Sequence, residues 1–326
     1  MSDKKVIAVA GATGAQGGGA ARAILADPNS GFTVRALTRY RNSPAARELA
    51  ELGAEVVQAD FYDEPTVHRA FEGAYGAFLV TNFWAHGSAA KETEEINVLI
   101  RAAKATGLRH VVWSTLEDTR ELLPLDDDRM PVLQDKYNLP HFDAKGEANE
   151  LFTQVGVPTT FLNTTFFFQA FLQGMGPQRA EDGVLALTLP LEDGKLLSGV
   201  DVADIGRIAH AILKGGEQFV GRTISLAGDH LTGAQYAEKL GAALGEPVRF
   251  QSVPYDVFRA LDIPAAAEIA NTFQYYGDFD QEFTGARDQP AARDPPGAEE
   301  LRRLAGRERL EDRGEVNEHD TYGGVP

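Results

Sequence analysis

The sequence predicts an α/β fold: a doubly wound parallel sheet followed by a smaller mixed α/β C-terminal domain. Short apolar runs alternate with helical patterns from residue 6 to residue 163. The loops between them are mostly short, and glycine or proline marks most of the boundaries. Parallel strands that are buried on both faces appear as continuous apolar runs, and they need helical crossovers between them.

The first apolar run, residues 6–10, precedes a glycine-rich turn and an alanine-rich helix at 16–25. Pro44 lies in the first turn of a later helix, and Gly107 and Gly156 each follow a helix end, which are the positions where these residue types are favoured. The remaining strands are expected at 32–37, 54–59, 77–80, 110–114 and 159–163, and the remaining helices at 44–52, 64–71, 88–106 and 142–155.

The chain changes character after residue 163. Its glycine and proline punctuation predicts small strands within 183–198 and at 223–227 and 248–253, with helices at 201–213, 233–244, 255–261 and 265–276. We expect residues 164–285 to form the smaller domain, with a segment at about 199–228 returning to the first. Residues 286–326 have too few large apolar residues to build a core, so a polar acidic tail is expected there, with one short helix at 298–304.

Composition excludes several classes of function. The 326 residues contain 31 Lys and Arg against 48 Asp and Glu, a net charge of -17, which argues against direct nucleic-acid binding. The absence of cysteine excludes disulfides, thiolate nucleophiles and cysteine-ligated metals. No apolar run approaches the ~20 residues of a membrane span, and no signal-peptide core follows Met1. We therefore expect a cytoplasmic protein that does not engage a membrane.

The turn after the first strand has the pattern GxxGxxG, formed by Gly11, Gly14 and Gly17. The first glycine permits the tight turn, the second lets the backbone approach a pyrophosphate, and the third lets the helix pack on the strand. The helix N-terminus then offers free amides to the phosphates. A merely structural turn is the alternative. The expected cofactor-binding residues of this turn are Gly11, Thr13, Gly14, Ala15, Gln16 and Gly17.

The end of the second strand indicates which dinucleotide is bound. Binders of NAD usually place a carboxylate there for the ribose 2′-hydroxyl, but this strand continues as Thr38-Arg39-Tyr40-Arg41. Arg39 and Arg41 can meet a 2′-phosphate, which favours NADP, unless both are simply solvated loop residues.

Further cofactor contacts are expected at the carboxyl ends of the other strands, because ligands lie outside these ends in open parallel sheets. Asp60 is placed to accept from the adenine amino group, with Phe61 beside the ring. The backbone after the sixth strand is placed to meet the nicotinamide carboxamide. The expected cofactor residues at these ends are Asp60, Phe61, Thr81, Asn82, Asn163 and Phe166.

Several of these segments, taken together, resemble the NmrA-like family of atypical short-chain dehydrogenases/reductases. The resemblance spans roughly residues 6–276 and is strongest toward the branch that contains the human NADPH sensor. It does not extend to the tail beyond residue 286. The segments that carry it are residues 11–17, Thr38-Arg39, residues 53–60, residues 78–82, residues 141–147 and residues 155–158.

The resemblance implies a Rossmann domain over residues 1–163 that binds NADP(H), and a smaller C-terminal domain. The family includes reductases of quinones, phenylpropanoids and similar carbonyl and olefin substrates. It also includes proteins that bind the dinucleotide without known turnover and report redox state to a protein partner.

Typical members of the superfamily carry a Tyr-x-x-x-Lys pair, one helical turn apart, and here the pair is His141 and Lys145. The resemblance implies that Lys145 lies near the nicotinamide ribose. An imidazole can act as a general acid near neutral pH, but His141 follows Pro140 and is equally compatible with a capping or solvent-facing role. Tyr137, one turn earlier, is a weaker substitute donor.

Other side chains complete the expected site. Ser114 and Thr115 end the fifth strand, where related proteins keep a hydroxyl that polarises the substrate carbonyl, although strand ends often carry such residues anyway. An apolar or aromatic substrate is expected beside rings that are otherwise part of the core. The rings in question are Phe83, Trp84, Phe167 and Phe168.

Two functions remain open at this point. The first is an NADP(H)-dependent reductase of a small apolar or aromatic carbonyl, imine or quinone, and the second is a non-catalytic redox sensor that regulates a protein partner. Folds of this kind often form dimers, so a homodimer is one expectation. No metal site is expected, since Asp126, Asp127 and Asp128 have the character of a solvated acidic loop.

Overall fold

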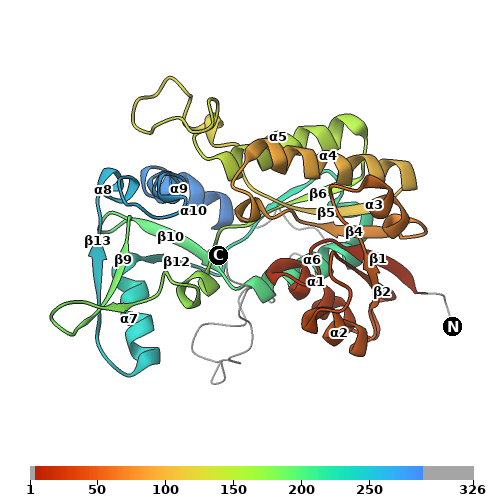
Figure 1. Cartoon of the computed structure of the whole chain (residues 1–326), viewed down its shortest axis with the longest axis horizontal. Coiled ribbons are helices and arrows are strands. Elements are labelled where there is room, and N and C mark those ends of the chain that lie inside the picture. Colours follow the sequence, from red (N-terminus) through yellow and green to blue (C-terminus); the bar gives the residue numbers. More distant parts are fainter. Residues whose placement is uncertain (1–3, 289–326) are drawn as a thin grey trace.

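The computed structural model describes residues 4–288, so the expected tail helix at 298–304 lies outside the described residues. The central feature is a parallel sheet of seven strands in the order β3-β2-β1-β4-β5-β6-β11, which confirms the predicted doubly wound class (Figure 1). Its strands are β1 (Lys5–Val9), β2 (Phe32–Thr38), β3 (Glu55–Gln58), β4 (Gly76–Leu79), β5 (His110–Thr115), β6 (Thr159–Asn163) and β11 (Thr223–Ser225).

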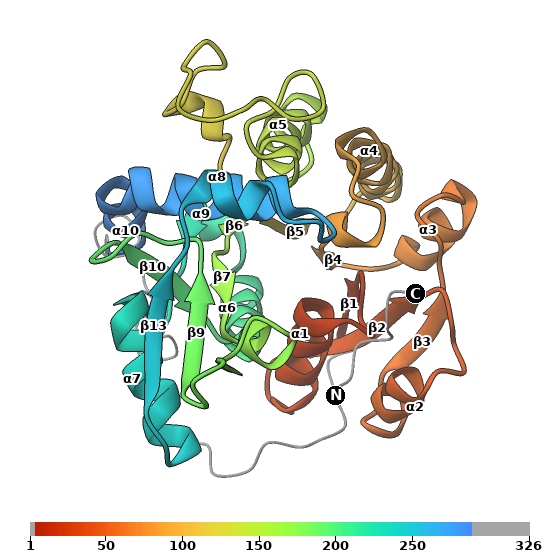
Figure 2. The same ribbon diagram turned by 60° about the vertical axis from the view of Figure 1, so that its left-hand side comes forward.

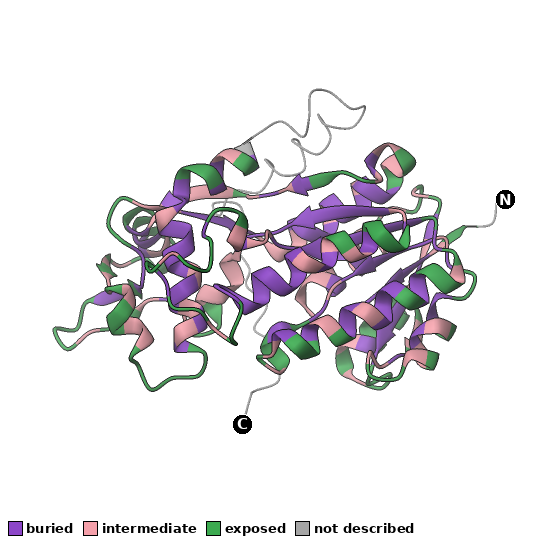
Figure 3. Ribbon diagram, turned by 90° about the horizontal axis from the view of Figure 1, so that it is seen from above, coloured by how far each residue is buried: buried purple, intermediate pink, exposed green. Residues whose placement is uncertain are grey.

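Helices cover both faces of this sheet. Buried residues of α1 (Ala15–Leu25), α2 (Pro44–Glu51) and α6 (Val202–Gly215) form one core with the strands. Those of α3 (Glu64–Phe71), α4 (Ala89–Thr106) and α5 (Pro140–Val155) form the other. The chain changes face between β3 and β4, so the connections that follow the neighbouring strands β1 and β4 leave toward opposite faces of the sheet, at the point where such folds bind ligands. Figure 3 shows the strands of the sheet buried between helices whose outer sides are exposed.

Helices α1 and α6 pack with their backbones nearly in contact. A Cβ added to Gly206 of α6 would lie 2.2 Å from the carbonyl carbon of Gly19 in α1. Position 206 therefore needs a residue without a side chain, and a Cβ at Gly19 would make a tight contact, 3.1 Å from the carbonyl oxygen of Val202. The helix that follows the glycine-rich turn is thus fixed by a segment from much later in the chain.

The second part of the molecule contains two three-stranded sheets, β12-β10-β7 and β13-β9-β8. The helix α7 lies on one side of them and α8, α9 and α10 lie on the other (Figures 1 and 2). The strands are β7 (Phe166–Phe167), β8 (Gln178–Arg179), β9 (Leu185–Leu189), β10 (Leu196–Val200), β12 (Asp229–Thr232) and β13 (Val248–Ser252). The helices are α7 (Gly233–Leu244), α8 (Tyr255–Arg259), α9 (Ala266–Asp278) and α10 (Asp280–Asp288).

The connections contain short 3-10 turns. The structure departs from the sequence expectations at helices α5 and α10 and at the short strands β7, β8 and β12, which were not expected. The turns are η1 (Phe83–Ala85), η2 (Thr119–Glu121), η3 (Phe168–Leu172) and η4 (Gly216–Phe219). Helix α5 begins at Pro140, two residues before the expected start. Helix α10 was not expected. It includes Arg287, whose guanidinium is buried against Glu117 at 2.7 Å, so residues 286–288 belong to a helix and not to a tail.

Within residues 4–288, no helix combines the length and apolar character that crossing a membrane requires.

Candidate functional site

The turn between β1 and α1 forms a cradle of glycine backbone. Gly11 has a φ of +59°, in the left-handed region that favours glycine. A Cβ at Gly17 would lie 2.3 Å from the carbonyl oxygen of Gly11, so any side chain there would collide with backbone. Gly14 is the N-cap of α1 and no side chain caps this end. The first-turn amides, which lack helical partners, fit a diphosphate group.

The end of β2 lies directly beside this turn. The hydroxyls of Thr13 and Thr38 are 3.3 Å apart, and the amide of Ala12 donates to the carbonyl of Leu37. Beyond them Arg39 is exposed, with its guanidinium 5.8 Å from the centre of the exposed Tyr40 ring. Arg41 is exposed as well. This edge therefore presents two guanidinium groups and no carboxylate from residues 38–41.

The ends of β3 and β4 hold the other expected adenosine-side residues. The Asp60 carboxylate accepts the backbone N–H of Tyr62 at 3.1 Å, which shapes its own turn. Phe61 is half-buried against the core beneath α3 and α4. Asn82 is exposed at the N-terminus of η1, whereas Thr81 is buried.

Lys145 lies at the centre of a buried polar contact between α5, β4 and α4. Its Nζ donates to Thr81 Oγ1 at 2.7 Å and forms an ion pair with Glu92 Oε1 at 2.8 Å. The ammonium also lies 4.8 Å from the centre of the Trp113 ring. Glu92 is fully buried and was not identified from the sequence, although it falls on the apolar stripe of a helix, three residues after Ala89 and four before Ile96.

His141 lies in the first turn of α5 and is buried, with 7% of its surface exposed. Its backbone N–H donates to Glu268 Oε1 at 3.1 Å, and its ring Nδ1 contacts the same oxygen. Glu268 comes from α9, and nothing local in the sequence indicates this contact across 127 residues. The ring centre is 5.7 Å from that of Phe83 and 5.0 Å from that of Trp84.

Tyr137 does not share this arrangement. Its hydroxyl donates to Glu147 Oε2 at 3.3 Å, and the Arg120 guanidinium lies 5.5 Å from the centre of its ring. The hydroxyl is thus engaged with a side chain two turns further along α5, away from His141.

The two hydroxyls at the end of β5 point in different directions. Ser114 Oγ donates to Gln16 Oε1 at 2.6 Å, which places it next to the glycine-rich turn. Thr115 Oγ1 donates to Asn149 Oδ1 at 2.9 Å and to the carbonyl of Lys145 at 3.2 Å. The Thr115 hydroxyl therefore holds α5 against the strand.

The aromatic residues expected at the substrate divide into two groups. Phe83 is buried, but Trp84 beside it is 51% exposed and forms an edge-to-face contact with the Phe83 ring. Phe166, Phe167 and Phe168 are half-buried and pack against separate cores, so only part of each ring is accessible. Just before them, Asn163 donates to Ser225 Oγ at 3.4 Å and keeps a buried Oδ1 that has no hydrogen bond within the described chain.

Glu92 also belongs to a cluster with His86 and Glu95. His86, Glu92 and Glu95 place one nitrogen and two carboxylate oxygens within 4.8 Å of one another. Burial, together with the charge of Glu92, raises the pKa of Glu95 to about 7. The neighbouring Tyr62 hydroxyl has its pKa raised to about 12 by burial and by Glu95.

The substitution Glu95→Gln is expected to change how stability depends on pH. Since the folded-state pKa of Glu95 is about 7, against a reference value of 4.5, its contribution is complete below pH 4.5 and is lost as pH rises through 7. The variant should therefore match wild type near pH 4 and be more stable by about 3 kcal/mol at pH 8. Urea unfolding at several pH values measures this difference.

The matched control for this experiment is Glu94→Gln, an exposed neighbour on the same helix. It should show the pH dependence of wild type. A Glu95→Gln protein whose advantage does not grow between pH 4 and 8 would contradict the assignment.

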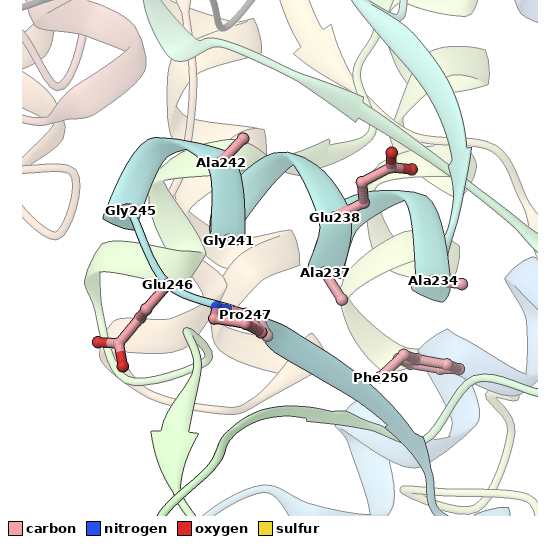
Figure 4. A pocket seen from close by; sticks show the side chains of 10 residues that line it. Ala234, Ala237, Glu238, Gly241, Ala242, Gly245, Glu246, Pro247 and Phe250 are labelled. Atoms are coloured by element: carbon pink, nitrogen blue, oxygen red, sulfur yellow. The ribbon is translucent and has the colours of Figure 1, made fainter.

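A separate pocket lies on the opposite part of the molecule. It is lined by Ala237, Glu238 and Gly241 of α7 and by Pro247 and Phe250 around the start of β13 (Figure 4). None of the residues that the sequence predicts to bind cofactor or substrate lines it. Most of the side chains discussed above lie instead at the carboxyl ends of β1 to β6.

Comparisons with known proteins identify a family and a shared fold. A model of the NmrA-like family matches residues 3–304. An "NmrA-like family domain-containing oxidoreductase" of Aspergillus flavus, lnbB, is 30% identical over 265 residues, which cover 77% of each chain.

Two solved structures share the fold. One is NmrA, described as a negative transcriptional regulator, in complex with NADP, with a TM-score of 0.70 and 23% identity over 93% of this chain and 91% of that one. The other is an NADPH-dependent quinone oxidoreductase of Escherichia coli bound to NADPH, with a TM-score of 0.66 and 20% identity over 92% of this chain and 94% of that one.

Proposed function

Since the chain belongs to the NmrA-like family, we propose that it binds NADP(H) and reduces a small apolar or aromatic carbonyl, imine or quinone. One observation carries the reductase proposal. The His141 imidazole is held by the Glu268 carboxylate beside Phe83 and Trp84, one helical turn from Lys145. This arrangement supplies a proton donor at the position where related proteins have tyrosine.

The residues present fit the cofactor. The glycine cradle at Gly11 and Gly17 accommodates a diphosphate, and Arg39 and Arg41 suit a 2′-phosphate through charge-assisted hydrogen bonds. Lys145 would contact the nicotinamide ribose, and Asn163, whose buried Oδ1 lacks a hydrogen bond within the described chain, would contact the carboxamide. When bound, the reduced nicotinamide supplies a hydride to the substrate carbon.

The proton for the substrate oxygen or nitrogen would come from Nε2 of His141. Glu268 holds Nδ1, which fixes the orientation of the ring. After transfer the imidazole is neutral, with the Nδ1 proton directed at Glu268, and Nε2 takes a new proton from water. One hydride and one proton therefore add to each substrate molecule.

The substrate would lie beside Trp84. An indole that is 51% exposed next to the proposed proton donor offers a flat apolar surface for an aromatic or quinone ring. Ser114 would add a hydroxyl on the cofactor side. The Thr115 hydroxyl is engaged with α5, so we assign it no role at the substrate.

Fluorescence titration with NADPH and NADH, followed by oxidation assays, tests this proposal. We expect tighter binding of NADPH and its oxidation by at least one member of a panel of quinones, aldehydes, ketones and imines. Equal affinity for the two nucleotides would contradict the cofactor assignment. Tight NADPH binding with no oxidation by the panel would contradict the reductase assignment for those substrate classes.

A redox sensor is the second candidate. The observation that favours it is that no tyrosine hydroxyl is available at the proton-donor position. Residue 141 is histidine, and the hydroxyl of the nearby Tyr137 is engaged with Glu147. A sensor would bind NADPH and NADP+ and change its affinity for a protein partner without turnover. NADPH binding with no oxidation, together with nucleotide-dependent protection of the second part of the chain in hydrogen exchange, would favour this function.

A further inference from the structure

Glu92 is a buried carboxylate whose two oxygens face different groups. Oε1 accepts the Thr81 hydroxyl at 2.6 Å and lies 2.8 Å from Nζ of Lys145. Oε2 faces Nε2 of His86 at 3.4 Å and has no hydrogen bond within the described chain. The Glu92 side chain has no exposed surface, and that of Lys145 is 9% exposed.

Such burial makes each of the two charges depend on the other. An isolated charge in an apolar interior is strongly disfavoured, and removing one partner of a buried pair leaves the other uncompensated. Glu92 also lies in the first turn of α4, next to the Ser88 N-cap, where the helix dipole favours a negative charge. The Glu92 carboxylate is thus the counter-ion of the Lys145 ammonium, and removing it would leave the ammonium uncompensated.

The hydrogen bond of His86 shows which of its ring nitrogens carries the proton. Its Nδ1 accepts the backbone N–H of Ser88 at 3.1 Å, and burial lowers the pKa of its imidazole. A neutral ring that accepts at Nδ1 carries its proton on Nε2. That proton faces Glu92 Oε2 at 3.4 Å and Glu95 Oε2 at 4.0 Å.

The proton on Nε2 of His86 argues against a metal ion between His86, Glu92 and Glu95. Coordination at Nε2 would need the proton to move to Nδ1, where it would face the amide of Ser88. The ammonium of Lys145 already balances the charge of Glu92. The group is therefore better described as an electrostatic support for Lys145 than as a cation site.

We propose that Glu92 is the positioning residue of Lys145: it keeps the ammonium charged and fixes it between Thr81 and Trp113, ready to contact the cofactor. This inference rests on the proposed function for the role of Lys145 toward the nicotinamide ribose. The charge-holding part is a property of the cofactor-free protein. Glu92 acts through Lys145 and is not itself proposed to touch the substrate.

Other ionisable groups face this region and enter the design of the test. His86 and Glu95 lie on the side of η1 and α4. His141, one turn away on α5, is paired with Glu268 of α9. These four groups are unchanged in a Glu92 variant, so comparison with wild type at each pH isolates the effect of Glu92.

The first test measures how readily Lys145 reacts with acetic anhydride in the cofactor-free protein as a function of pH, read by peptide mass spectrometry. The reagent attacks only the unprotonated amine. In Glu92→Gln the ammonium loses its counter-ion, so at pH 8 we expect Lys145 to react at least about tenfold faster than in wild type. The exposed Lys91 serves as the internal standard, and Glu94→Gln is the matched control variant.

Glu92→Asp keeps the charge on a shorter side chain and guards against a folding defect in Glu92→Gln. It should keep Lys145 nearly as unreactive as in wild type. Equal reactivity of Lys145 in wild type and Glu92→Gln would overturn the inference. If Glu92→Gln does not fold, fast labelling of Lys145 in Glu92→Asp would overturn it and slow labelling would support it.

The second test is the dissociation constant of NADPH between pH 6.5 and 9. In Glu92→Gln we expect affinity to fall by about tenfold more than in wild type over this range, because the amine becomes neutral. The double variant Glu92→Gln/Lys145→Arg should lose this extra pH dependence, since guanidinium stays charged. A wild type that does not bind NADPH would refute the proposed function, while the labelling result would still decide the role of Glu92.

Discussion

His141→Asn is expected to lower turnover by about a hundredfold to ten-thousandfold, the range contributed by a positioned general acid, with little change in NADPH affinity. Asparagine keeps an N–H near the position of Nδ1, so the contact with Glu268 can persist. It has no group that can transfer a proton from the position of Nε2. The comparison of steady-state turnover with NADPH affinity therefore separates proton transfer from cofactor binding.

Two variants accompany this experiment. His68→Asn changes a half-exposed histidine on α3 that pairs with Glu72, and it should leave turnover unchanged. Glu268→Gln keeps the shape of the acid but removes its charge, so it holds Nδ1 less firmly and should lower turnover less than His141→Asn does. Wild-type turnover in His141→Asn would remove this residue as the proton donor.

Arg39→Ala is expected to weaken NADPH binding by about tenfold to a hundredfold, the value of one charge-assisted pair, and to leave NADH binding nearly unchanged. Arg39 is exposed and stacked near Tyr40, so its loss removes no core contact. Fluorescence titration with each nucleotide gives the two affinities. In the wild-type protein, the ratio of NADPH affinity to NADH affinity should also fall as salt concentration rises, because an exposed ionic contact is screened.

Arg69→Ala provides the control for net charge. Arg69 is an exposed arginine on α3, outside the turn and the end of β2, and its removal should weaken NADPH binding much less. Arg41→Ala measures the share of the second guanidinium. An Arg39→Ala protein with unchanged preference for NADPH would show that the discriminating contact lies elsewhere.

The parts of the molecule that local sequence could predict are those that depend on hydrophobic periodicity and on the positions of glycine and proline. Six apolar runs before residue 164 became strands of the main sheet, because strands buried on both faces have a distinctive composition. The glycines at 11 and 17 were identified for the reasons that the structure displays, a positive φ and a backbone approach too close for a side chain. Lys145 and Thr81 were expected at the same site for separate reasons, and in the structure Lys145 Nζ donates to Thr81 Oγ1 at 2.7 Å.

The parts that could not be predicted depend on contacts between distant segments. Glu268 meets His141 across 127 residues, and no local pattern in α9 distinguishes this glutamate from a solvated one. Glu92 did leave a signal, since a carboxylate on the apolar stripe of a helix requires a buried partner. That signal could not say which cation would meet it.

The direction in which a side chain points was the other feature that the sequence could not predict. Ser114 and Thr115 are adjacent at the end of β5, and alternation along a strand sends neighbouring side chains to opposite faces. One hydroxyl consequently meets Gln16 beside the glycine-rich turn, and the other meets Asn149 on α5. The sequence gives both residues the same chemistry, and only the register of the strand separates them.

The close packing of Gly19 against Gly206 has a consequence for the order in which the chain folds. Helix α1 presents its N-terminus to the cradle, yet one side of it is completed by α6, which follows β10 far along the chain. Contacts of such large sequence separation form late, because a long loop must close before they are gained. A growing chain that has reached only the end of β6 thus has every glycine of the cradle but lacks the helix that fixes it, so nucleotide affinity should mature only when α6 has docked.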